Sequence, residues 1–135
     1  KKICNTAAKI ALGNKEYLRL GDLSISRDWG WAPDYVEAMW KMLQQNKPED
    51  FVISTGKLSK LSDFVHHAFF SLGLDWEKYI IYDKKLERPS EIKSGYGSSK
   101  KAKKKLNWSA KTLMPQVASK MALHEFNFLK KNYKR

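Results

Sequence analysis

The stretch RDWGWAPDYVEAMW, residues 27–40, contains the signals that decide the fold on either side of it. Pro33 suits the first turn of a helix, where its missing N–H is not needed, and Asp34 suits the positive end of the helix dipole. Four apolar residues then recur at the spacing of one helical face: Val36, Met39, Trp40 and Leu43. This pattern predicts an amphipathic helix that ends near Asn46, just before a Lys-Pro pair.

Helices and short strands alternate on both sides of this segment. We predict helices over 2–12, from Ser59 or Ser62 to Leu72, over 100–106 and from Met114 onward, and strands over 17–20, 51–54 and 79–82. The inward positions are Leu61, Phe64, Val65, Ala68, Phe69 and Leu72 in the third helix and Val117, Met121 and Phe128 in the last. The alternation predicts a mixed α/β or α+β class, and 135 residues suffice for one domain, residues 1–135.

The composition is strongly basic. The chain has 26 Lys and Arg against 14 Asp and Glu, which gives a formal net charge of +12. Such a charge favours an anionic partner: nucleic acid, a phosphate-bearing small molecule or an acidic membrane. Cys4 is the only cysteine, so no internal disulfide can form, and a reducing compartment such as the cytoplasm is expected. No apolar run approaches the roughly 20 residues that cross a bilayer, and no secretory signal is visible.

Two patterns imitate catalytic motifs. Tyr96-Gly97-Ser98-Ser99-Lys100 has the Tyr-x-x-x-Lys spacing that places an acid/base tyrosine beside a lysine on one helix. Its glycine and serines, however, belong at the start of a helix and not inside one. Gly95-Tyr96-Gly97 lacks both a third glycine and a strand directly before it, so it fails as a dinucleotide-binding loop. We interpret both patterns as coincidental.

The lysines between residues 100 and 105 form the densest basic run. A solvated helix anchored by Leu106 and Trp108 is the favoured interpretation, and contact with nucleic-acid phosphates is the alternative. No zinc-ligand spacing or RNA-binding aromatic signature supports that alternative. We expect His66 and His67 at the surface and His124 partly buried, and we predict no metal site.

Arg27 and Arg88 are the candidate binding residues. Each lies at a bend of the chain beside a bulky or rigid residue, Trp29 for the first and Pro89 for the second. An arginine fork matches phosphate oxygens bidentately, so two forks from separate loops could clamp a diphosphate. The residues alone support two interpretations equally. Arg27 and Arg88 either clamp a diphosphate or are ordinary surface or ion-paired arginines.

Five segments spread over the chain are LGDLSISRDWGWAPDYVEAMWKMLQQ, PEDFVISTGKLSKLSDFV, LGLDWEKYIIYD, RPSE and KAKKKLNW. Together they resemble the C-terminal portion of GDP-mannose 4,6-dehydratases, an extended branch of the short-chain dehydrogenase/reductases. The resemblance implies the substrate-binding part of a longer enzyme, without most of its Rossmann domain. The absence of an initial methionine fits a fragment of this kind.

The family's reaction removes water from GDP-mannose to give GDP-4-keto-6-deoxymannose, on the way to GDP-fucose, and uses a bound NADP. The catalytic and NADP-binding motifs are absent from this sequence, so the resemblance implies substrate binding only and no activity of the chain alone. It assigns Arg27 and Arg88 to the diphosphate, Glu91 to the ribose hydroxyls and Lys2 to the vicinity of the nucleotide. The implied partners are GDP-mannose or a related nucleotide sugar, the N-terminal Rossmann domain of the same enzyme and further copies in a homo-oligomer, with neither membrane nor nucleic acid.

Several positions depart from the family pattern. Asp22 stands where the family usually has Asn, and the loop over 86–98 differs most. The first alternative is therefore the substrate domain of another nucleotide-sugar dehydratase or epimerase, and the second is a non-enzymatic basic module that binds nucleic acid. The resemblance also implies that the 34–46 helix packs against the cofactor domain, so this chain alone should expose its apolar face. We expect Trp29 and Trp31 to wedge the loop that directs Arg27.

Overall fold

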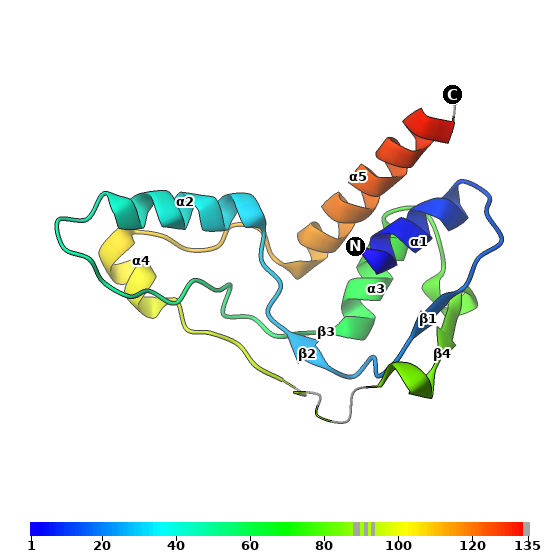
Figure 1. Ribbon diagram of the computed structural model, residues 1–135, viewed down its shortest axis with the longest axis horizontal. Helices are drawn as coiled ribbons and strands as arrows, with labels where there is room; N and C mark the ends of the chain where they lie inside the picture. The colour runs from blue at the N-terminus through cyan, green and yellow to red at the C-terminus, as the bar shows by residue number, and fades with distance from the viewer. Residues whose placement is uncertain (88–89, 91, 93, 134–135) are drawn as a thin grey trace.

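The structure of the protein is a computed structural model that describes residues 1–87, 90, 92 and 94–133. Its elements are α1 (Lys2–Ala11), β1 (Leu18–Leu20), β2 (Ser26–Arg27), α2 (Ala32–Leu43), β3 (Ser59–Lys60), α3 (Leu61–Phe70), η1 (Trp76–Lys78), β4 (Ile80–Tyr82), η2 (Lys84–Leu86), α4 (Lys100–Leu106) and α5 (Met114–Tyr133). Figure 1 shows two groups of helices, with α1, α3 and α5 in one and α2 and α4 in the other. Extended segments join the groups, and the class is mixed α/β, as predicted.

The larger group buries a core between α1, α3 and α5. Ala68 of α3 and Ala118 and Ala122 of α5 are fully buried there, and such small side chains let helices approach closely. Phe64 and Cys4 fill the remaining space. The predicted apolar stripe of α3 is confirmed, since Phe64, Val65, Ala68 and Phe69 are all buried.

A parallel pair of short strands, β1 and β4, lies beside this core. Leu18 pairs with Ile80 and Leu20 with Tyr82, and both leucines are buried. Just after β1, Gly21 passes so close to Leu86 that an added Cβ would lie 2.9 Å from the Leu86 carbonyl oxygen. A residue without a side chain at position 21 therefore allows the segment before residue 88 to reach the end of β1.

The smaller group packs α2 and α4 around Trp108. Trp108 is 1% exposed, and Ala38, Ala102 and Leu106 are buried with it. Lys101 and Lys105, on the exposed side of α4, both pair with Glu49, at 3.0 and 2.5 Å. The prediction of a solvated lysine-rich helix anchored by Leu106 and Trp108 is confirmed.

The strand predicted over 51–54 is wrong. Residues 51–58 form no strand, and the strand follows them as β3, which pairs antiparallel with β2. Phe51 and Ile53 nevertheless pack against the Trp108 cluster. The apolar pattern therefore reflects burial on a neighbouring cluster, a requirement that sequence alone does not separate from sheet pairing.

Several predicted helix ends also differ from the structure, and α3 ends at Phe70 instead of Leu72. Neither Ser59 nor Ser62 caps α3, because Lys60 is the N-cap residue and its amide donates to the Asp63 carboxylate at 3.3 Å. The helix α2 ends at Leu43, before the predicted Asn46.

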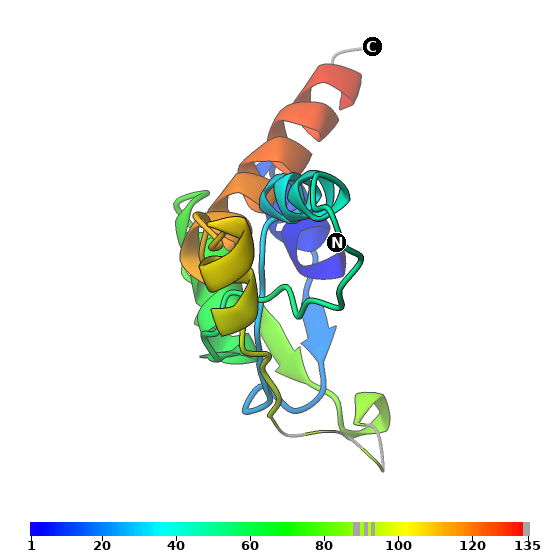
Figure 2. The same ribbon diagram turned by 90° about the vertical axis from the view of Figure 1, so that its left-hand side faces the viewer.

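The last helix is less buried than predicted. Phe128 is 57% exposed and His124 is exposed too, so the inward placement of both is wrong. Figure 2 shows the reason, because the C-terminal half of α5 extends away from the rest of the molecule. The N-terminal half carries the buried residues Met114, Val117, Ala118 and Ala122.

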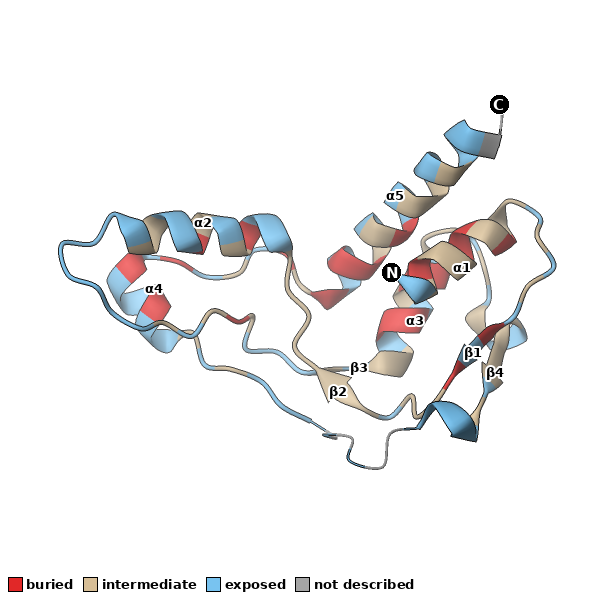
Figure 3. Ribbon diagram, in the orientation of Figure 1, coloured by how far each residue is buried: buried red, intermediate tan, exposed pale blue. Residues whose placement is uncertain are grey.

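The apolar face of α2 is open. Its stripe residues have exposed fractions of 60% for Val36, 58% for Met39, 61% for Trp40 and 82% for Leu43. Figure 3 shows how much of this helix is exposed. The predicted exposure of this face is confirmed.

Candidate functional site

Arg27 is the last residue of β2, at the point where the chain leaves the larger helix group. It pairs with Ser59 of β3 in antiparallel register and is half-buried. Its Nη1 donates a hydrogen bond to the Ser26 carbonyl oxygen at 2.9 Å. The backbone at Arg27 is therefore fixed by the β2–β3 pair.

Asp28 ties the Arg27 loop to a second segment of the chain. Its carboxylate accepts the backbone amides of Thr55 at 3.2 Å and of Gly56 at 2.8 Å, and also the Thr55 hydroxyl. Gly56 has a φ of +72°, a conformation that favours glycine. Three charge-assisted bonds to one carboxylate hold the 55–56 turn beside Arg27.

The next residues pack this loop against the larger helix group. The Trp29 ring packs on Phe64 of α3 with ring centroids 5.3 Å apart, whereas the Trp31 ring has the Lys120 ammonium 5.1 Å from its centroid. Both tryptophan rings of this loop therefore contact side chains of neighbouring helices. These contacts place Trp29 and Trp31 against α3 and α5 and leave the Arg27 backbone in the β2–β3 pair.

Gly30 lies directly under the side chain of Tyr35. A Cβ added at Gly30 would lie 1.8 Å from the Tyr35 hydroxyl oxygen, so this position excludes every other residue unless Tyr35 moves. Tyr35 also contacts Trp108, with ring centroids 6.1 Å apart. Burial raises the pKa of the Tyr35 phenol, and the carboxylates of Asp28 and Asp34 raise it further.

Asp34 joins the loop to the start of α5. Its Oδ2 accepts the backbone amides of Lys111 and Thr112, both at 2.8 Å, and its backbone carbonyl accepts the Trp108 indole N–H at 2.8 Å. Asp34 is only 9% exposed, so these bonds satisfy a carboxylate that water scarcely reaches. The sequence predicted a dipole-stabilising role for Asp34 but not this bridge, and nothing local in the sequence signals it.

Of the remaining predicted binding residues, the structure describes only Lys2. Lys2 is exposed at the start of α1, and its ammonium donates to the Arg19 carbonyl oxygen of β1 at 2.7 Å. Arg88 and Glu91 lie outside the described residues. In the segment before them, the backbone of Leu86 packs closely against Gly21, and the Glu87 carboxylate accepts a hydrogen bond from the Tyr82 hydroxyl.

The two coincidental motifs do not form catalytic geometry. Tyr96 precedes α4, whereas Lys100 is the first residue of that helix. Both line a cavity of about 380 Å³ together with Gly56, Gly97, Ser98, Ser99 and Lys103. Gly97, Ser98 and Ser99 thus lie directly before the start of α4, as the sequence predicted.

Neither a metal site nor a membrane span emerges from the part of the chain that the structure describes. No group of three or more His, Cys, Asp or Glu side chains is arranged to hold a metal ion among the described residues. Among those residues, too, no helix is long and apolar enough to cross a membrane.

Comparison with known proteins identifies close sequence relatives. A family model described as GDP-mannose 4,6 dehydratase matches residues 1–121. The GDP-mannose 4,6 dehydratase of Dictyostelium discoideum is 40% identical over 96% of this chain and 41% of its own length. That of Homo sapiens is 37% identical over 98% of this chain and 40% of its own length. The chain thus spans about two fifths of the length of these relatives.

The fold has relatives among solved structures as well. The structure of RMD from Pseudomonas aeruginosa complexed with NADPH superposes with a TM-score of 0.82 at 16% sequence identity. The match covers 93% of this chain and 41% of that one. At this identity the likeness shows a shared fold, and it extends over both helix groups.

Proposed function

Because this chain belongs to the GDP-mannose 4,6-dehydratase family, we propose that it is the nucleotide-sugar-binding part of such a dehydratase. The proposed substrate is GDP-mannose, and the whole enzyme converts it to GDP-4-keto-6-deoxymannose with loss of water. The observation that carries the proposal is the Arg27 loop. A half-buried arginine stands on a segment fixed by β3 and by the three bonds to Asp28, which is the preorganisation that bidentate phosphate binding requires.

We assign Arg27 and Arg88 to the diphosphate, Glu91 to the ribose hydroxyls and Lys2 to the nucleotide. Contacts around β1 support this grouping. Lys2 bonds the Arg19 carbonyl of that strand, and Gly21 at its end contacts the segment that leads to Arg88. The first turn of α1 and the segment before Arg88 therefore share β1 as a neighbour.

NADP is the hydride carrier proposed for the whole enzyme. The described residues of this chain do not fit it, because Tyr96 and Lys100 do not share a helix and no strand leads into Gly95. We therefore assign to this chain the binding of substrate and no step of the hydride chemistry. The carrier belongs, in this proposal, to the part of the relatives that the chain does not match.

The same part of the relatives is the proposed partner of α2. A contiguous stripe of four largely exposed apolar side chains is unusual on a free surface and typical of an interface. Docking of the cofactor domain on this stripe would place it next to the Arg27 loop, since α2 begins directly after that loop. The shared substrate cleft would then lie between the two parts.

The test is binding of GDP, GDP-mannose and guanosine to the 135-residue chain, measured by calorimetry for the unchanged chain, Arg27→Ala and Arg19→Ala. Arg19 is an exposed arginine of β1, so its replacement is a matched control for loss of one charge. We expect Arg27→Ala to weaken GDP binding at least tenfold and to leave guanosine binding unchanged. UDP should bind more weakly than GDP if the base is read as well.

Two results would overturn the proposal. Equal weakening of GDP binding by Arg27→Ala and Arg19→Ala would show a general charge effect and remove the diphosphate role. Equal binding of GDP and UDP would favour a different nucleotide sugar as the substrate.

A further inference from the structure

The cavity of about 380 Å³ beside α4 has a basic, hydroxyl-rich lining that the proposed function does not use. It is lined by Gly56 and Gly97, by the hydroxyl side chains of the 96–99 segment and by Lys100 and Lys103. No acidic side chain lines it. Its volume lies within the range of about 300–1,000 Å³ typical of ligand pockets. The cavity therefore offers positive charge and hydrogen-bond donors, with no carboxylate to repel an anion.

Two glycines bring separate segments of the chain together at this cavity. A Cβ added at Gly97 would lie 2.7 Å from a Val52 methyl carbon and 3.1 Å from the Ser54 hydroxyl oxygen. A Cβ added at Gly56 would lie 3.9 Å from the Gly97 carbonyl oxygen. Ser54 is only 7% exposed, and its hydroxyl has no hydrogen-bonding partner among the described residues, which is rare for a buried hydroxyl. A polar atom without a partner thus lies directly behind the cavity wall at Gly97.

The lysines of α4 fall into two groups according to their partners. Lys101 and Lys105 pair with Glu49 at 3.0 and 2.5 Å. Lys100 and Lys103 have neither an ion-pair nor a hydrogen-bonding partner among the described residues. At 100° per residue, the two pairs lie on nearly opposite sides of the helix. The charge that lines the cavity is therefore charge that no described carboxylate neutralises.

One small anion can contact several of these donors at once. Lys100 and Lys103 are three positions apart on one helix, so their Cβ atoms are about 5–6 Å apart. The Lys103 amide donates to the Ser99 carbonyl oxygen at 2.9 Å, which places Ser99 beside both lysines. The Ser99 hydroxyl makes no cap hydrogen bond. Two flexible ammonium groups and one hydroxyl can therefore converge on the oxygens of a single ligand.

We propose that this cavity binds the phosphate group of a small phosphate-bearing molecule. A phosphate monoester carries close to two negative charges and three terminal oxygens, so it can accept from both ammonium groups and from a hydroxyl. A carboxylate has one charge and two oxygens, and a cation would meet two lysines and no acid. The proposal is independent of the diphosphate role of Arg27, because none of the lining residues belongs to the Arg27 loop.

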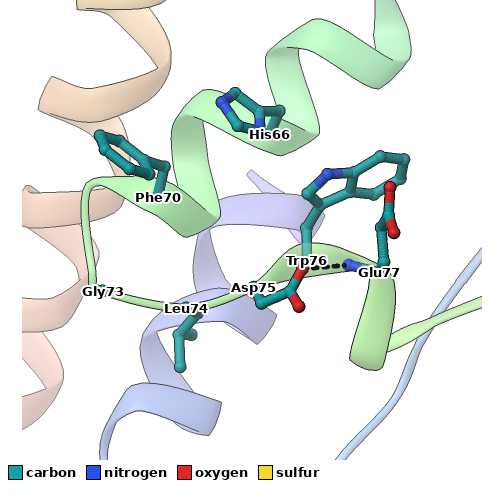
Figure 4. A pocket seen from close by; sticks show the side chains of 7 residues that line it. All are labelled: His66, Phe70, Gly73, Leu74, Asp75, Trp76 and Glu77. Carbon is teal, nitrogen blue, oxygen red and sulfur yellow. Dashed lines mark hydrogen bonds between the residues drawn. The ribbon is translucent and has the colours of Figure 1, made fainter.

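A second cavity, of about 500 Å³, provides a contrast on the outer face of α3. Figure 4 shows the side chains that line it, with Asp75 and Glu77 among them. Neither a lysine nor an arginine lines this cavity. It should therefore not respond to phosphate, and residues 73–77 serve as an internal control against a general effect of the net charge of +12.

The test is titration of the 135-residue chain with inorganic phosphate, with acetate as a singly charged probe and a short DNA duplex as a polymeric one. Backbone NMR shifts report the binding. The double variant Lys100→Gln with Lys103→Gln removes the charge that lines the cavity. The matched control, Lys101→Gln with Lys105→Gln, removes the same charge from the other side of the same helix. Arg27→Ala tests independence from the diphosphate site.

We expect saturable phosphate binding with a dissociation constant on the order of 1 mM, with shifts at residues 56 and 96–103 and none at 73–77. The cavity variant should weaken this binding about fivefold or more, and the control variant less than about twofold. Arg27→Ala should leave the shifts at 96–103 unchanged even if it abolishes GDP binding. All replaced lysines are exposed, so the fold should persist, and the remaining NMR spectrum verifies it.

Three results would overturn the proposal. Equal weakening by the two lysine variants, or shifts that extend to residues 73–77, would show general charge attraction. Acetate binding as tight as that of phosphate would remove the phosphate preference. Tighter binding of the DNA duplex than of phosphate, at equal phosphate concentration, would show that the lysines bind a nucleic-acid backbone instead of a small molecule.

Discussion

The carboxylate of Asp28 accepts the backbone amide of Gly56 at 2.8 Å across 28 positions of the chain. This contact fixes the turn beside Arg27. Asp28→Ala should leave two backbone amides and a hydroxyl without their acceptor and lower the free energy of unfolding by about 1–3 kcal/mol. Urea denaturation measures this change. Asp50→Ala, which removes an exposed carboxylate without a partner among the described residues, should have almost no effect; equal losses in both variants would contradict the structural role of Asp28.

Gly30 is required by the position of the Tyr35 ring. Gly30→Ala should force that ring away from Trp108 and destabilise the protein by about 1–3 kcal/mol, the usual cost of overpacking. The control is Gly95→Ala, because an added Cβ there meets nothing within 4 Å. Thermal unfolding of both variants decides the question. A Gly30→Ala protein as stable as Gly95→Ala would show that Tyr35 occupies another position.

The ion pairs of Glu37 predict a pH-dependent contribution to stability. Lys111 at 2.7 Å and Lys41 at 3.2 Å lower the pKa of the Glu37 carboxyl. A carboxyl whose pKa is lowered by folding stabilises the protein above its unfolded pKa of about 4, and this contribution disappears as the pH falls through the lowered value. Glu37→Gln should therefore melt at a slightly lower temperature than the unchanged chain near pH 7.

The difference between the two melting temperatures should shrink as the pH falls below the ordinary carboxyl range, and added salt should reduce it at neutral pH. Glu77→Gln is the control, since Glu77 has no ion-pair partner among the described residues. A difference for Glu37→Gln that persists unchanged at low pH would rule out the ion pairs as its cause.

The exposed stripe of α2 predicts dye binding or self-association of the chain. Met39→Gln combined with Trp40→Gln should reduce binding of a hydrophobic fluorescent dye severalfold and change the free energy of unfolding by less than about 0.5 kcal/mol, because both side chains are largely exposed. Leu123→Gln combined with Phe128→Gln removes apolar area from α5 and is the control. A large loss of stability in the α2 variant would instead show that the stripe packs within the chain.

The parts of the fold that depend on local pattern were predictable. The stripe of α3 and the position of Pro33 at the start of α2 follow from spacing and from the chemistry of helix ends. Contacts between distant segments were not predictable. The prediction of a strand over 51–54 was wrong because Phe51 and Ile53 pack on the Trp108 cluster instead of in a sheet. The prediction that Phe128 is buried was wrong because α5 extends beyond the helices that cover its first half.

In the candidate site, too, local sequence features could be recognised, whereas contacts between distant segments could not. Arg27 could be named as a candidate because it lies at a predicted bend near Trp29, but the residues alone supported an ordinary surface arginine equally, and the family resemblance supplied the diphosphate role. The carboxylates that shape its surroundings could not be named in this way, since Asp28 bonds residues 27 and 28 positions away and Asp34 bonds residues 77 and 78 positions away. Their roles exist only in three dimensions, and the residue types alone do not distinguish them from surface acids.

The bridge from Asp34 to Lys111 and Thr112 has a consequence for the order of folding. Contacts between residues so far apart in sequence form only after the intervening chain has been made and closed into a loop, which slows their formation. During synthesis, the segment that carries Arg27 leaves the ribosome long before its two acceptor bonds at Asp34 can be completed. The loop therefore acquires its final shape only once the start of α5 is present.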